Sequence, residues 1–472
     1  MSVAGPPQDA NPPLKGAAQR REPQAWGGHS SVAGPPQDAN PPLKGAAQRR
    51  EPQAWGDHSR GSAPIASALT RPQFSVLPAL SLYVHIPWCV RKCPYCDFNS
   101  HEARETPPED AYVDALLADL ESALPQVWGR RVASVFIGGG TPSLFSAASI
   151  DRLIAGIRAR LPLVAEAEIT LEANPGTFER EKFAGYFGAG VNRLSLGVQS
   201  FNPRHLEALG RIHDADEARR AAEAAMMIFG NVNLDLMFAL PGQTMQEAQA
   251  DVAAALSFGT PHLSLYQLTL EPNTLFHRHP PALPDEDLAA DMQQAVAARL
   301  EAAGHVRYEV SAYAKAARTS VHNVNYWRFG DYLGIGAGAH AKLSFPERIV
   351  REVRHKHPKQ YLDTMAAGNA RMETREIPRD EIGFEFMLNA LRLTAGVPSS
   401  LFQERTGFPL ALVAAPLAEG VRRGLLEADP SRIAGTELGR RFLNTTLQLF
   451  LPDARAHPVT PPIPITMAEP HR

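Results

Sequence analysis

Short apolar runs alternate with longer stretches of helical periodicity through the middle of this chain. Apolar residues spaced three to four positions apart predict helices between the runs. The expected strands lie at 81–86, 132–137, 167–172, 192–197, 232–237 and 262–267, and the helices at 108–124, 149–161, 179–188, 214–229 and 245–258. Six repeats of strand, loop and helix predict an α/β fold, a parallel sheet curled into a partial or full (β/α) barrel. The chemistry of such a fold gathers at the carboxyl ends of its strands.

The pattern changes near residue 284. A helix is expected at 285–303 and a further strand at 308–313, and a small helical module follows at 378–452. Its expected helices are 379–393, 399–406, 410–424 and 436–447, and a hairpin near 425–433 would make it winged-helix-like. We therefore expect a core domain at 73–283, an extension at 284–377 and the C-terminal helical domain.

Both ends of the chain differ from this body in composition. Residues 2–30 return almost unchanged as 31–59, with Gly28 replaced by Asp57 as the one difference. Pro, Gly, Ala, Gln and Arg dominate, so the segment lacks the apolar surface that would offset its ordering entropy. We expect residues 1–72 to be a disordered leader and 453–472 a frayed tail. A mitochondrial presequence is the alternative for the leader, but its acidic residues and prolines disfavour an amphipathic helix.

The chemistry centres on the three cysteines, Cys89, Cys93 and Cys96, which are the only ones in 472 residues. They form a C-x3-C-x2-C loop directly after the first expected strand. A [4Fe–4S] cluster normally takes four Cys ligands, so three would leave one iron open. This resembles radical S-adenosylmethionine (SAM) proteins, in which the amino and carboxylate groups of SAM chelate that iron. The alternatives are a zinc site, which needs a fourth ligand that is not obvious here, and a disulfide, which an odd cysteine count disfavours.

Composition narrows the class of protein. Hydrophobic residues make up 44% of the chain and charged residues 21%. These values are ordinary for a protein with a large core, and no apolar run is long enough for a membrane span. The net charge is −3, with a positive leader and a more acidic body, which argues against nucleic acid as the main partner. An oxygen-sensitive cluster without a secretory signal predicts a reducing compartment, the cytoplasm.

Other polar residues stand at the ends of expected strands. The run Gly138-Gly139-Gly140-Thr141-Pro142 follows the second strand. Because glycine has no Cβ, its backbone can approach a ligand closely and hold the SAM amino group. A tight strand-to-helix turn is the alternative. Four further candidates are Glu172 for the SAM ammonium, Gln199 and Asp235 for ribose hydroxyls, and Arg211 for the SAM carboxylate. A solvated strand end is the alternative for Glu172, and a surface arginine for Arg211. Tyr83, in the first strand, suits either a contact or the core.

These motifs together resemble a known family. Tyr83-Val-His-Ile-Pro-Trp-Cys89, Cys93-Pro-Tyr-Cys-Asp-Phe98, Gly138-Gly-Gly-Thr-Pro-Ser143, Gly197-Val-Gln-Ser200 and Asp235-Leu-Met are similar to the radical-SAM family of oxygen-independent coproporphyrinogen III oxidases. The similarity runs from about residue 80 to 452 and is greatest to the haem chaperone branch called HemW. The resemblance implies a radical-SAM barrel with Cys89, Cys93 and Cys96 as cluster ligands. The SAM contacts it implies are Tyr83, Gly139, Gly140, Thr141, Glu172, Gln199, Arg211 and Asp235.

Two features separate the branches of this family. True oxidases carry a further Cys two residues after the third, where this chain has Phe98. Conversely, His322-Asn-Val-Asn-Tyr-Trp327 resembles the H-N-x-x-Y-W signature of the haem chaperones. An imidazole is a good axial ligand of haem iron. His322 is therefore a candidate haem ligand, with a structural histidine packed against aromatic rings as the alternative. His340 is a second candidate.

The resemblance implies a protein that binds haem, a [4Fe–4S] cluster and SAM. We expect it to pass haem to an acceptor such as a respiratory, membrane-associated protein, without being an integral membrane protein itself. The alternative is an enzyme that cleaves SAM reductively and decarboxylates coproporphyrinogen III in porphyrin biosynthesis. Phe98 favours the chaperone, for which no catalytic residue is expected, and the complete SAM motifs keep the enzyme open.

Overall fold

The computed structural model describes residues 70–176 and 179–452. The expected leader up to residue 69 and the expected tail at 453–472 lie outside the described residues. A sheet of twelve strands forms the centre of the described fold, in the order β14-β13-β12-β11-β1-β4-β5-β6-β7-β8-β10-β9. Its strands are β1 (Leu80–Ile86), β4 (Val132–Gly139), β5 (Leu163–Ala173), β6 (Arg193–Gln199), β7 (Val232–Phe238), β8 (His262–Gln267), β9 (Val306–Arg307), β10 (Ala312–Ala314), β11 (Asp331–Ile335), β12 (His340–Phe345), β13 (Arg348–Arg354) and β14 (Arg371–Glu376).

The six strands predicted from the apolar runs are β1, β4, β5, β6, β7 and β8. Each pairs in parallel with the next, and β11 adds a seventh parallel strand beside β1. The order has two ends, β14 and β9, so the described sheet is a partial and not a closed barrel. Both ends are extended by antiparallel strands. This confirms the α/β class.

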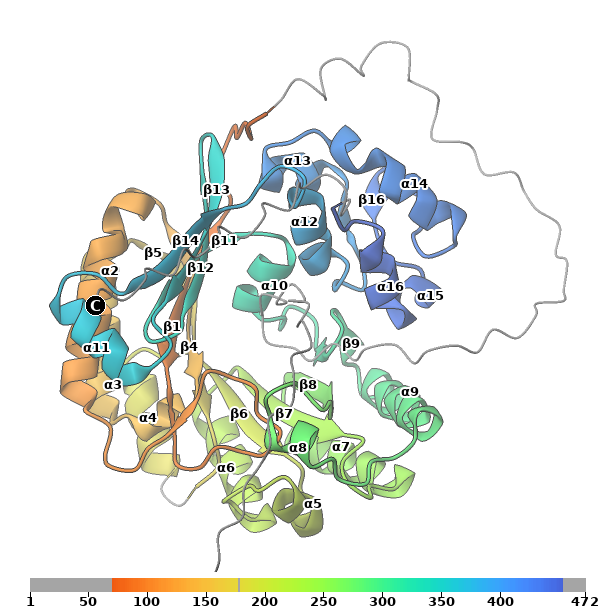
Figure 1. Cartoon of the computed structure of the whole chain (residues 1–472). Helices are drawn as coiled ribbons and strands as arrows, with labels where there is room; N and C mark the ends of the chain where they lie inside the picture. The colour runs from red at the N-terminus through yellow and green to blue at the C-terminus, as the bar shows by residue number, and fades with distance from the viewer. Residues whose placement is uncertain (1–69, 177–178, 453–472) are drawn as a thin grey trace, which may run out of the picture. The chain divides into compact units, whose positions relative to one another are not determined.

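Helices connect these strands, most of them packed on the outer face of the sheet (Figure 1), with the helix Val321–Trp327 on the inner face. They are α2 (Glu109–Val127), α3 (Ala147–Arg160), α4 (Glu179–Gly188), α5 (Pro203–Ala208), α6 (Ala215–Ile228), α7 (Met245–Ser257), α8 (Leu275–Arg278), α9 (Glu286–Ala302), α10 (Val321–Trp327) and α11 (Pro358–Ala366), with the 3-10 turn η1 (Pro142–Leu144). Several begin where the sequence supplies a cap. The side chains of Asp214 and Thr244, for example, form capping boxes with Glu217 and Glu247.

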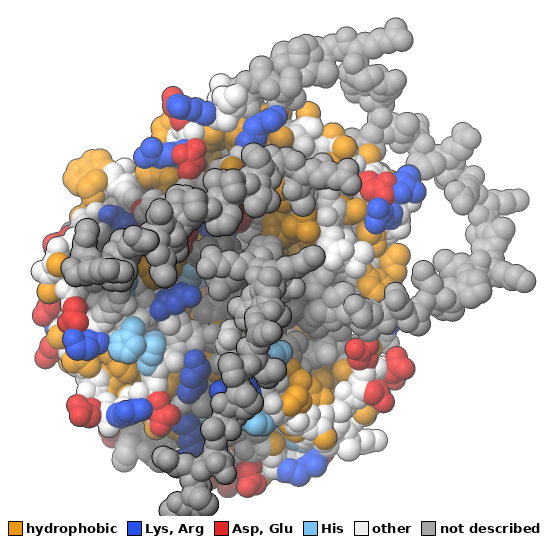
Figure 2. Space-filling view, in the orientation of Figure 1, with side chains coloured by type: hydrophobic (Ala, Val, Ile, Leu, Met, Phe, Trp, Pro, Cys, Tyr) orange, Lys and Arg blue, Asp and Glu red, His pale blue; other side chains and the backbone are white. Residues whose placement is uncertain are grey.

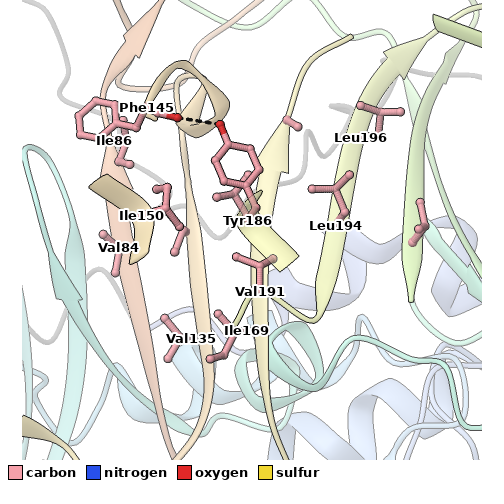
Figure 3. Close-up of a cluster of buried hydrophobic side chains, with 14 of the residues drawn as sticks. Val84, Ile86, Val135, Phe145, Ile150, Ile169, Tyr186, Val191, Leu194 and Leu196 are labelled. Carbon is pink, nitrogen blue, oxygen red and sulfur yellow. Dashed lines mark hydrogen bonds between the residues drawn. The ribbon is translucent and has the colours of Figure 1, made fainter. Parts of the chain in front are cut away.

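Alternation along the strands separates two chemical environments. Figure 3 shows outward-facing residues such as Val84, Val135 and Leu194 packed with Ile150 of α3 and Tyr186 of α4. Successive strand residues point to opposite faces. The intervening positions on the inner face are mostly polar and are listed here: Ser81, Tyr83, His85, Ser134, Phe136, Glu168, Thr170, Glu172, Ser195, Asn233 and Asp235. The inner face of the sheet is therefore where polar chemistry is concentrated.

The C-terminal segment is helical, as expected. It contains α12 (Ile382–Ala390), α13 (Ser400–Thr406), η2 (Leu410–Val413), α14 (Ala414–Arg422), α15 (Glu437–Arg441) and α16 (Leu443–Gln448), with short strands β15 (Val397–Pro398) and β16 (Arg432–Ile433). Its apolar core also includes Phe329 and Ile349 from the preceding segment.

Three local expectations need correction. The strand expected at 308–313 is only the short β10. Before it, the Glu309 carboxylate accepts the Ser311 amide and pairs with Arg392, and this local contact takes the place of a longer extended strand. The helix expected at 436–447 divides into α15 and α16 at Phe442, whose ψ of 49° is not helical. The hairpin expected at 425–433 is only an isolated bridge between Leu426 and Gly435, while β16 pairs with β15.

Charged side chains are mixed over the surface. Around the edge of the face shown in Figure 2, Lys or Arg side chains lie next to Asp or Glu. Exposed pairs such as Arg422–Glu419 and Arg432–Glu427 show the same mixing. Within residues 70–176 and 179–452, no helix is both long and apolar enough to cross a membrane.

Candidate functional site

The three cysteines lie in one closed loop at the carboxyl end of β1. After Ile86 the chain forms β2 (Trp88–Cys89), which pairs with β3 (His101–Glu102). The His101 amide donates to the Pro87 carbonyl at 2.7 Å, and the Ala103 amide donates to the Cys89 carbonyl at 2.8 Å. All three thiols are free and half-buried. The loop thus presents three thiols from a fixed base, as the spacing predicted.

Asn99 and His85 hold the far side of this loop. The His85 ring hydrogen-bonds through Nε2 to the Asn99 carbonyl at 2.9 Å and through Nδ1 to the Tyr83 hydroxyl at 2.9 Å. The Asn99 side-chain amide donates to the carbonyls of Ala337 and Lys356 at 2.9 and 3.0 Å. The cysteine loop is thereby fastened to the turn between β11 and β12. Sequence reasoning missed both roles.

Polar donors surround the thiols. The Thr141 hydroxyl donates to Cys89 Sγ at 3.5 Å, and Arg211 Nη1 donates to Cys93 Sγ at 3.7 Å. Burial raises the pKa of the Cys89 and Cys96 thiols, and hydrogen bonds from Thr141 and Ser100 oppose that rise. Among the described residues, no three His, Cys, Asp or Glu side chains converge on a single metal ion. An iron–sulfur cluster does not require such convergence, because each of its cysteines ligates a different iron.

The glycine run is shaped by close contacts within the chain. Gly139 has a φ of +122°, and a Cβ there would lie 2.6 Å from the His85 ring. A Cβ on Gly140 would lie 2.5 Å from the Trp88 carbonyl oxygen. The Gly139 amide donates to Glu172 Oε2 at 3.0 Å, and the Gly140 amide donates to the Ile86 carbonyl at 2.8 Å. The Cβ directions of Gly139 and Gly140 therefore face His85 and Trp88, and their contact with SAM stays a prediction.

Two carboxylates share the inner face beside this run. Burial, and then the nearby charge of Asp235, raise the pKa of Glu172 to about 8, against the opposing hydrogen bond from Gly139. Asp235 accepts from the Ser195 hydroxyl at 3.0 Å and from the Asn233 amide at 2.9 Å, and burial raises its pKa. A cationic ligand would stabilise the ionised form of both carboxyl groups and lower their pKa values. These two carboxyl groups therefore fit the ammonium and sulfonium charges of SAM.

Arg211 reaches the cysteine loop from the segment after α5. Its Nη2 donates to the carbonyl of Gly197 and to Asn174 Oδ1, both at 2.7 Å. Asn174 also donates to the Thr141 hydroxyl at 2.8 Å, so it connects the glycine run to Arg211. Sequence reasoning missed Asn174, although its place at the end of β5 was a usable signal. A pocket beside the cysteine loop is lined by Cys93, Thr141, Asn174 and Arg211, among others.

Gln199 ends β6 with a φ of +70°, directly after a register shift against β7. A non-glycine residue in this region of φ stores strain that its surroundings must hold. A Cβ built on Gly197 would lie 2.8 Å from Asn174 Oδ1 and 3.1 Å from Gln199 Nε2. The Gln199 side chain therefore lies at the same carboxyl edge of the sheet as Asn174 and Arg211.

Tyr83 and His322 belong to one aromatic cluster below this edge. Tyr83 stacks on Phe136 with ring centroids 6.2 Å apart, and Phe136 stacks on His322 at 5.0 Å. Tyr326 meets His322 edge-on at 5.0 Å. His322 is 2% exposed, and its Nδ1 lies 3.0 Å from the Ser134 hydroxyl. His340, the second candidate, is partly exposed at the start of β12, opposite Val353.

Comparison with known proteins adds to this geometry. Residues 83–255 match the model of the Radical SAM superfamily, and residues 377–442 match the HemN C-terminal domain. A protein of Escherichia coli (strain K12) named Heme chaperone HemW is 48% identical over 377 residues, which cover 79% of this chain and 99% of that protein. A Heme chaperone HemW of Bacillus subtilis (strain 168) is 36% identical over 383 residues, 79% of this chain and 99% of that protein.

A solved structure gives the same fold. Coproporphyrinogen III oxidase (HemN) from Escherichia coli, described as a radical SAM enzyme, superposes with a TM-score of 0.68 and 25% identity, covering 79% of this chain and 90% of that one. The HemW relatives match nearly their whole length, and the cysteine loop and the glycine run lie within the radical-SAM match. The chain belongs to the HemW family of radical SAM proteins.

Proposed function

We propose that this protein binds haem and delivers it to an acceptor protein, and that it carries a [4Fe–4S] cluster and SAM. The observation that carries the haem proposal is the similarity, over 79% of the chain, to relatives named haem chaperones. The three half-buried thiols in one anchored loop support the cluster. Cys89, Cys93 and Cys96 would ligate the cluster. Such a cluster with SAM supplies one-electron chemistry when both are bound.

The remaining residues bind and orient SAM in this proposal. Glu172 and Asp235 are the proposed carboxyl partners of the SAM cation on the inner face, and Arg211 supplies a cation for the SAM carboxylate. Tyr83, Gly139, Gly140, Thr141 and Gln199 complete the proposed contacts. Asn174 fixes Arg211 against Thr141 through hydrogen bonds of 2.7 and 2.8 Å, so we add it to the site as a positioning residue.

His322 is the proposed haem ligand, with His340 as the second candidate. His322 is packed between Phe136 and Tyr326 and is 2% exposed. Iron ligation at this ring therefore requires a local movement of α10 away from its neighbours. The aromatic rings of Tyr326 and Trp327 in the same helix would then be available to face a porphyrin.

Coproporphyrinogen III oxidation is the second candidate function. The likeness to HemN in fold, with a TM-score of 0.68, favours it. The position at which the oxidases carry a further Cys is occupied by Phe98, whose side chain is 43% exposed. A side chain without a thiol cannot take over that role, so we rank haem delivery first.

We place the activity in the cytoplasm, where thiolates stay reduced. The partners we propose are haem and a haem-requiring acceptor, such as a respiratory protein at the membrane, and not a nucleic acid. We also propose the division into a core at 73–283, an extension at 284–377 and a C-terminal domain at 378–452.

An anaerobic assay separates the two functions. The reconstituted protein, with its cluster verified, is incubated with SAM, a low-potential reductant and coproporphyrinogen III. We expect no protoporphyrinogen, and its formation would make the protein a decarboxylase.

Haem titration then tests the ligand. We expect His322→Ala to shift or weaken the Soret band of the haem complex, whereas His340→Ala leaves it unchanged. The reverse pattern would move the ligand to His340.

A further inference from the structure

The inner face of β6, β7 and β8 carries buried polar side chains that the proposed function has not used. Strand pairing brings Asn233 of β7 opposite Ser195 on one side and His262 on the other. Asp235 lies two residues further along β7, opposite Ser264. Asn233 is 3% exposed and His262 is 1% exposed, whereas Asp235 is partly exposed. Buried polar groups are costly without partners, so their hydrogen bonds indicate what they do.

Asn233 is the centre of this network. Its side-chain nitrogen donates to Ser195 Oγ at 2.8 Å and to Asp235 Oδ1 at 2.9 Å. Its side-chain oxygen accepts from the Ser264 hydroxyl at 3.1 Å and lies 2.6 Å from His262 Nδ1. Both hydrogens and the oxygen of this amide are therefore engaged. Only this orientation of the amide supplies a donor to Asp235.

His262 holds the amide in that orientation. A carbonyl oxygen can only accept, so the imidazole hydrogen is on Nδ1 and points to Asn233. The other ring nitrogen, Nε2, accepts from the Tyr308 hydroxyl at 2.9 Å. Burial lowers the pKa of His262 well below its ordinary value, so the ring is neutral and has this single donor. The hydrogen bonds therefore run in one direction, from Tyr308 through His262 and Asn233 to Asp235.

The donors converge on the carboxyl group of Asp235. Asn233 donates to Oδ1, and the Ser195 hydroxyl donates to Oδ2 at 3.0 Å. Burial raises the pKa of Asp235, and the hydrogen bonds from its polar neighbours oppose that rise. Each oxygen of the carboxylate keeps a further lone pair, so the group can accept from hydroxyl donors of a ligand.

We propose that His262, acting through Asn233, is a positioning residue that aims the Asp235 carboxylate at the ribose hydroxyls of SAM. The proposal rests on the proposed function, in which Asp235 contacts SAM. The ligand chemistry is a nucleoside with free ribose hydroxyls, because a carboxylate accepts hydrogen bonds and donates none. A side chain that its neighbours already hold in place leaves less ordering cost for the binding step.

The test is calorimetric titration of the full, cluster-loaded chain with SAM and with its 2′,3′-dideoxy analogue. We expect the native protein to bind the analogue about tenfold or more weakly, because hydrogen bonds to a charged acceptor are lost. His262→Leu removes the donor to Asn233. It should lower the affinity for SAM toward that for the analogue and leave the affinity for the analogue unchanged.

Two further variants separate positioning from a loss of stability. His262→Asn places an amide nitrogen close to the position of Nδ1, so it should restore the preference for SAM over the analogue. The matched control is His305→Leu. His305 is also 2% exposed, but its Nε2 contacts the Thr260 carbonyl at 2.9 Å, outside the network. This control should lower the free energy of unfolding and keep the native preference.

A loss of affinity by the same factor for SAM and the analogue in His262→Leu would overturn the proposal, because the residue would then be structural only. Should His262→Leu fail to fold, Tyr308→Phe decides the question. It removes the hydroxyl from which His262 Nε2 accepts, and it should reduce the preference for SAM by a smaller factor. An unchanged preference in Tyr308→Phe would also overturn the proposal.

Asp235→Asn distinguishes a failure of the positioning role from a failure of the proposed function. If Asp235→Asn keeps the native preference, Asp235 does not contact the ribose, and the positioning role fails with that contact. If Asp235→Asn loses the preference and His262→Leu keeps it, only the positioning role is wrong.

Discussion

A single residue of the cysteine loop should decide whether a cluster forms. Cys93→Ala removes one of only three thiols, and the chain has no other cysteine to replace it. We expect the brown iron–sulfur absorbance and the bound iron to be lost, since cluster irons are held by thiolates. Ser100→Ala is the control, because Ser100 contacts Cys96 Sγ at 3.7 Å without being a proposed ligand. A full cluster in the Cys93 variant would contradict the ligand assignment.

The carboxyl of Glu172 predicts a pH dependence of SAM binding. Its pKa of about 8 leaves it mostly protonated at neutral pH, whereas an ammonium ligand favours the carboxylate. Affinity should therefore rise with pH, by at most about tenfold per unit, and level off above 8. The stability that the protonated group contributes to the ligand-free fold is fully present below its ordinary pKa of 4.5 and is lost as pH rises through 8.

Calorimetry of the cluster-loaded protein with SAM between pH 6 and 9 measures this dependence. Glu172→Gln should bind more weakly and lose the rise that the native protein shows, which separates this carboxyl from titration of SAM itself. An unchanged slope in the variant would assign the proton to another group.

At the scale of elements, the glycine run fixes the end of β4 against the end of β1. Gly139→Ala places a Cβ 2.6 Å from the His85 ring at a φ of +122°. The backbone strain alone costs about 1–3 kcal/mol, and displacement of His85 adds to it. Because His85 holds the Asn99 carbonyl, we expect both a lower free energy of unfolding and poorer cluster retention.

The control for this variant is Gly129→Ala, between α2 and β4. Its φ is +74° and no heavy atom lies within 4 Å of the added Cβ. It should cost only the left-handed backbone term of about 1–2 kcal/mol and leave the cluster intact. Equal losses in urea denaturation of the two variants would mean that the His85 contact is unimportant.

Periodicity predicted the six parallel strands from β1 to β8 and most helices, because alternating or helical spacing reports which face of an element is buried. It did not predict the antiparallel strands β12, β13 and β14. They contain charged residues such as Arg351, Glu352 and Arg354, which are buried only because they pair within the fold. A pattern of polar residues predicts exposure, and only the tertiary partners reverse that expectation.

At the scale of the whole molecule, buried ion pairs connect the sheet to the C-terminal helices. Arg351 in β13 donates to Glu385 in α12 at 2.5 and 3.3 Å and to the Tyr332 hydroxyl at 2.9 Å. Removing one partner leaves an uncompensated buried charge. Glu385→Ala should therefore lower the free energy of unfolding by about 3–5 kcal/mol, measured by urea denaturation.

The double variant Arg351→Met with Glu385→Leu tests the cause of that loss. Replacing a buried pair with apolar residues of similar volume is often close to neutral. We expect the double variant to recover most of the stability lost in Glu385→Ala. A double variant as unstable as the single one would mean that the pair itself, and not the unpaired charge, supplies the stability.

The sequence by itself determined the fold class and the place of the three cysteines in one loop. Residues adjacent along the chain, such as Cys89, Cys93 and Cys96, share one loop whatever the rest of the chain does. The strand ends that carry Gly139, Glu172 and Gln199 were likewise predicted to meet, because parallel strands bring their carboxyl ends to one edge.

The tertiary structure alone decided which distant residues touch. Asn174 joins Thr141 to Arg211, and Glu168 holds the start of α10, which follows it by about 150 residues along the chain. It also decided that the close approach of Gly139 is to His85. These contacts depend on strand register and on the packing of α10 against the inner face. Local periodicity carries no information about either, because each results from the balance of many long-range contacts.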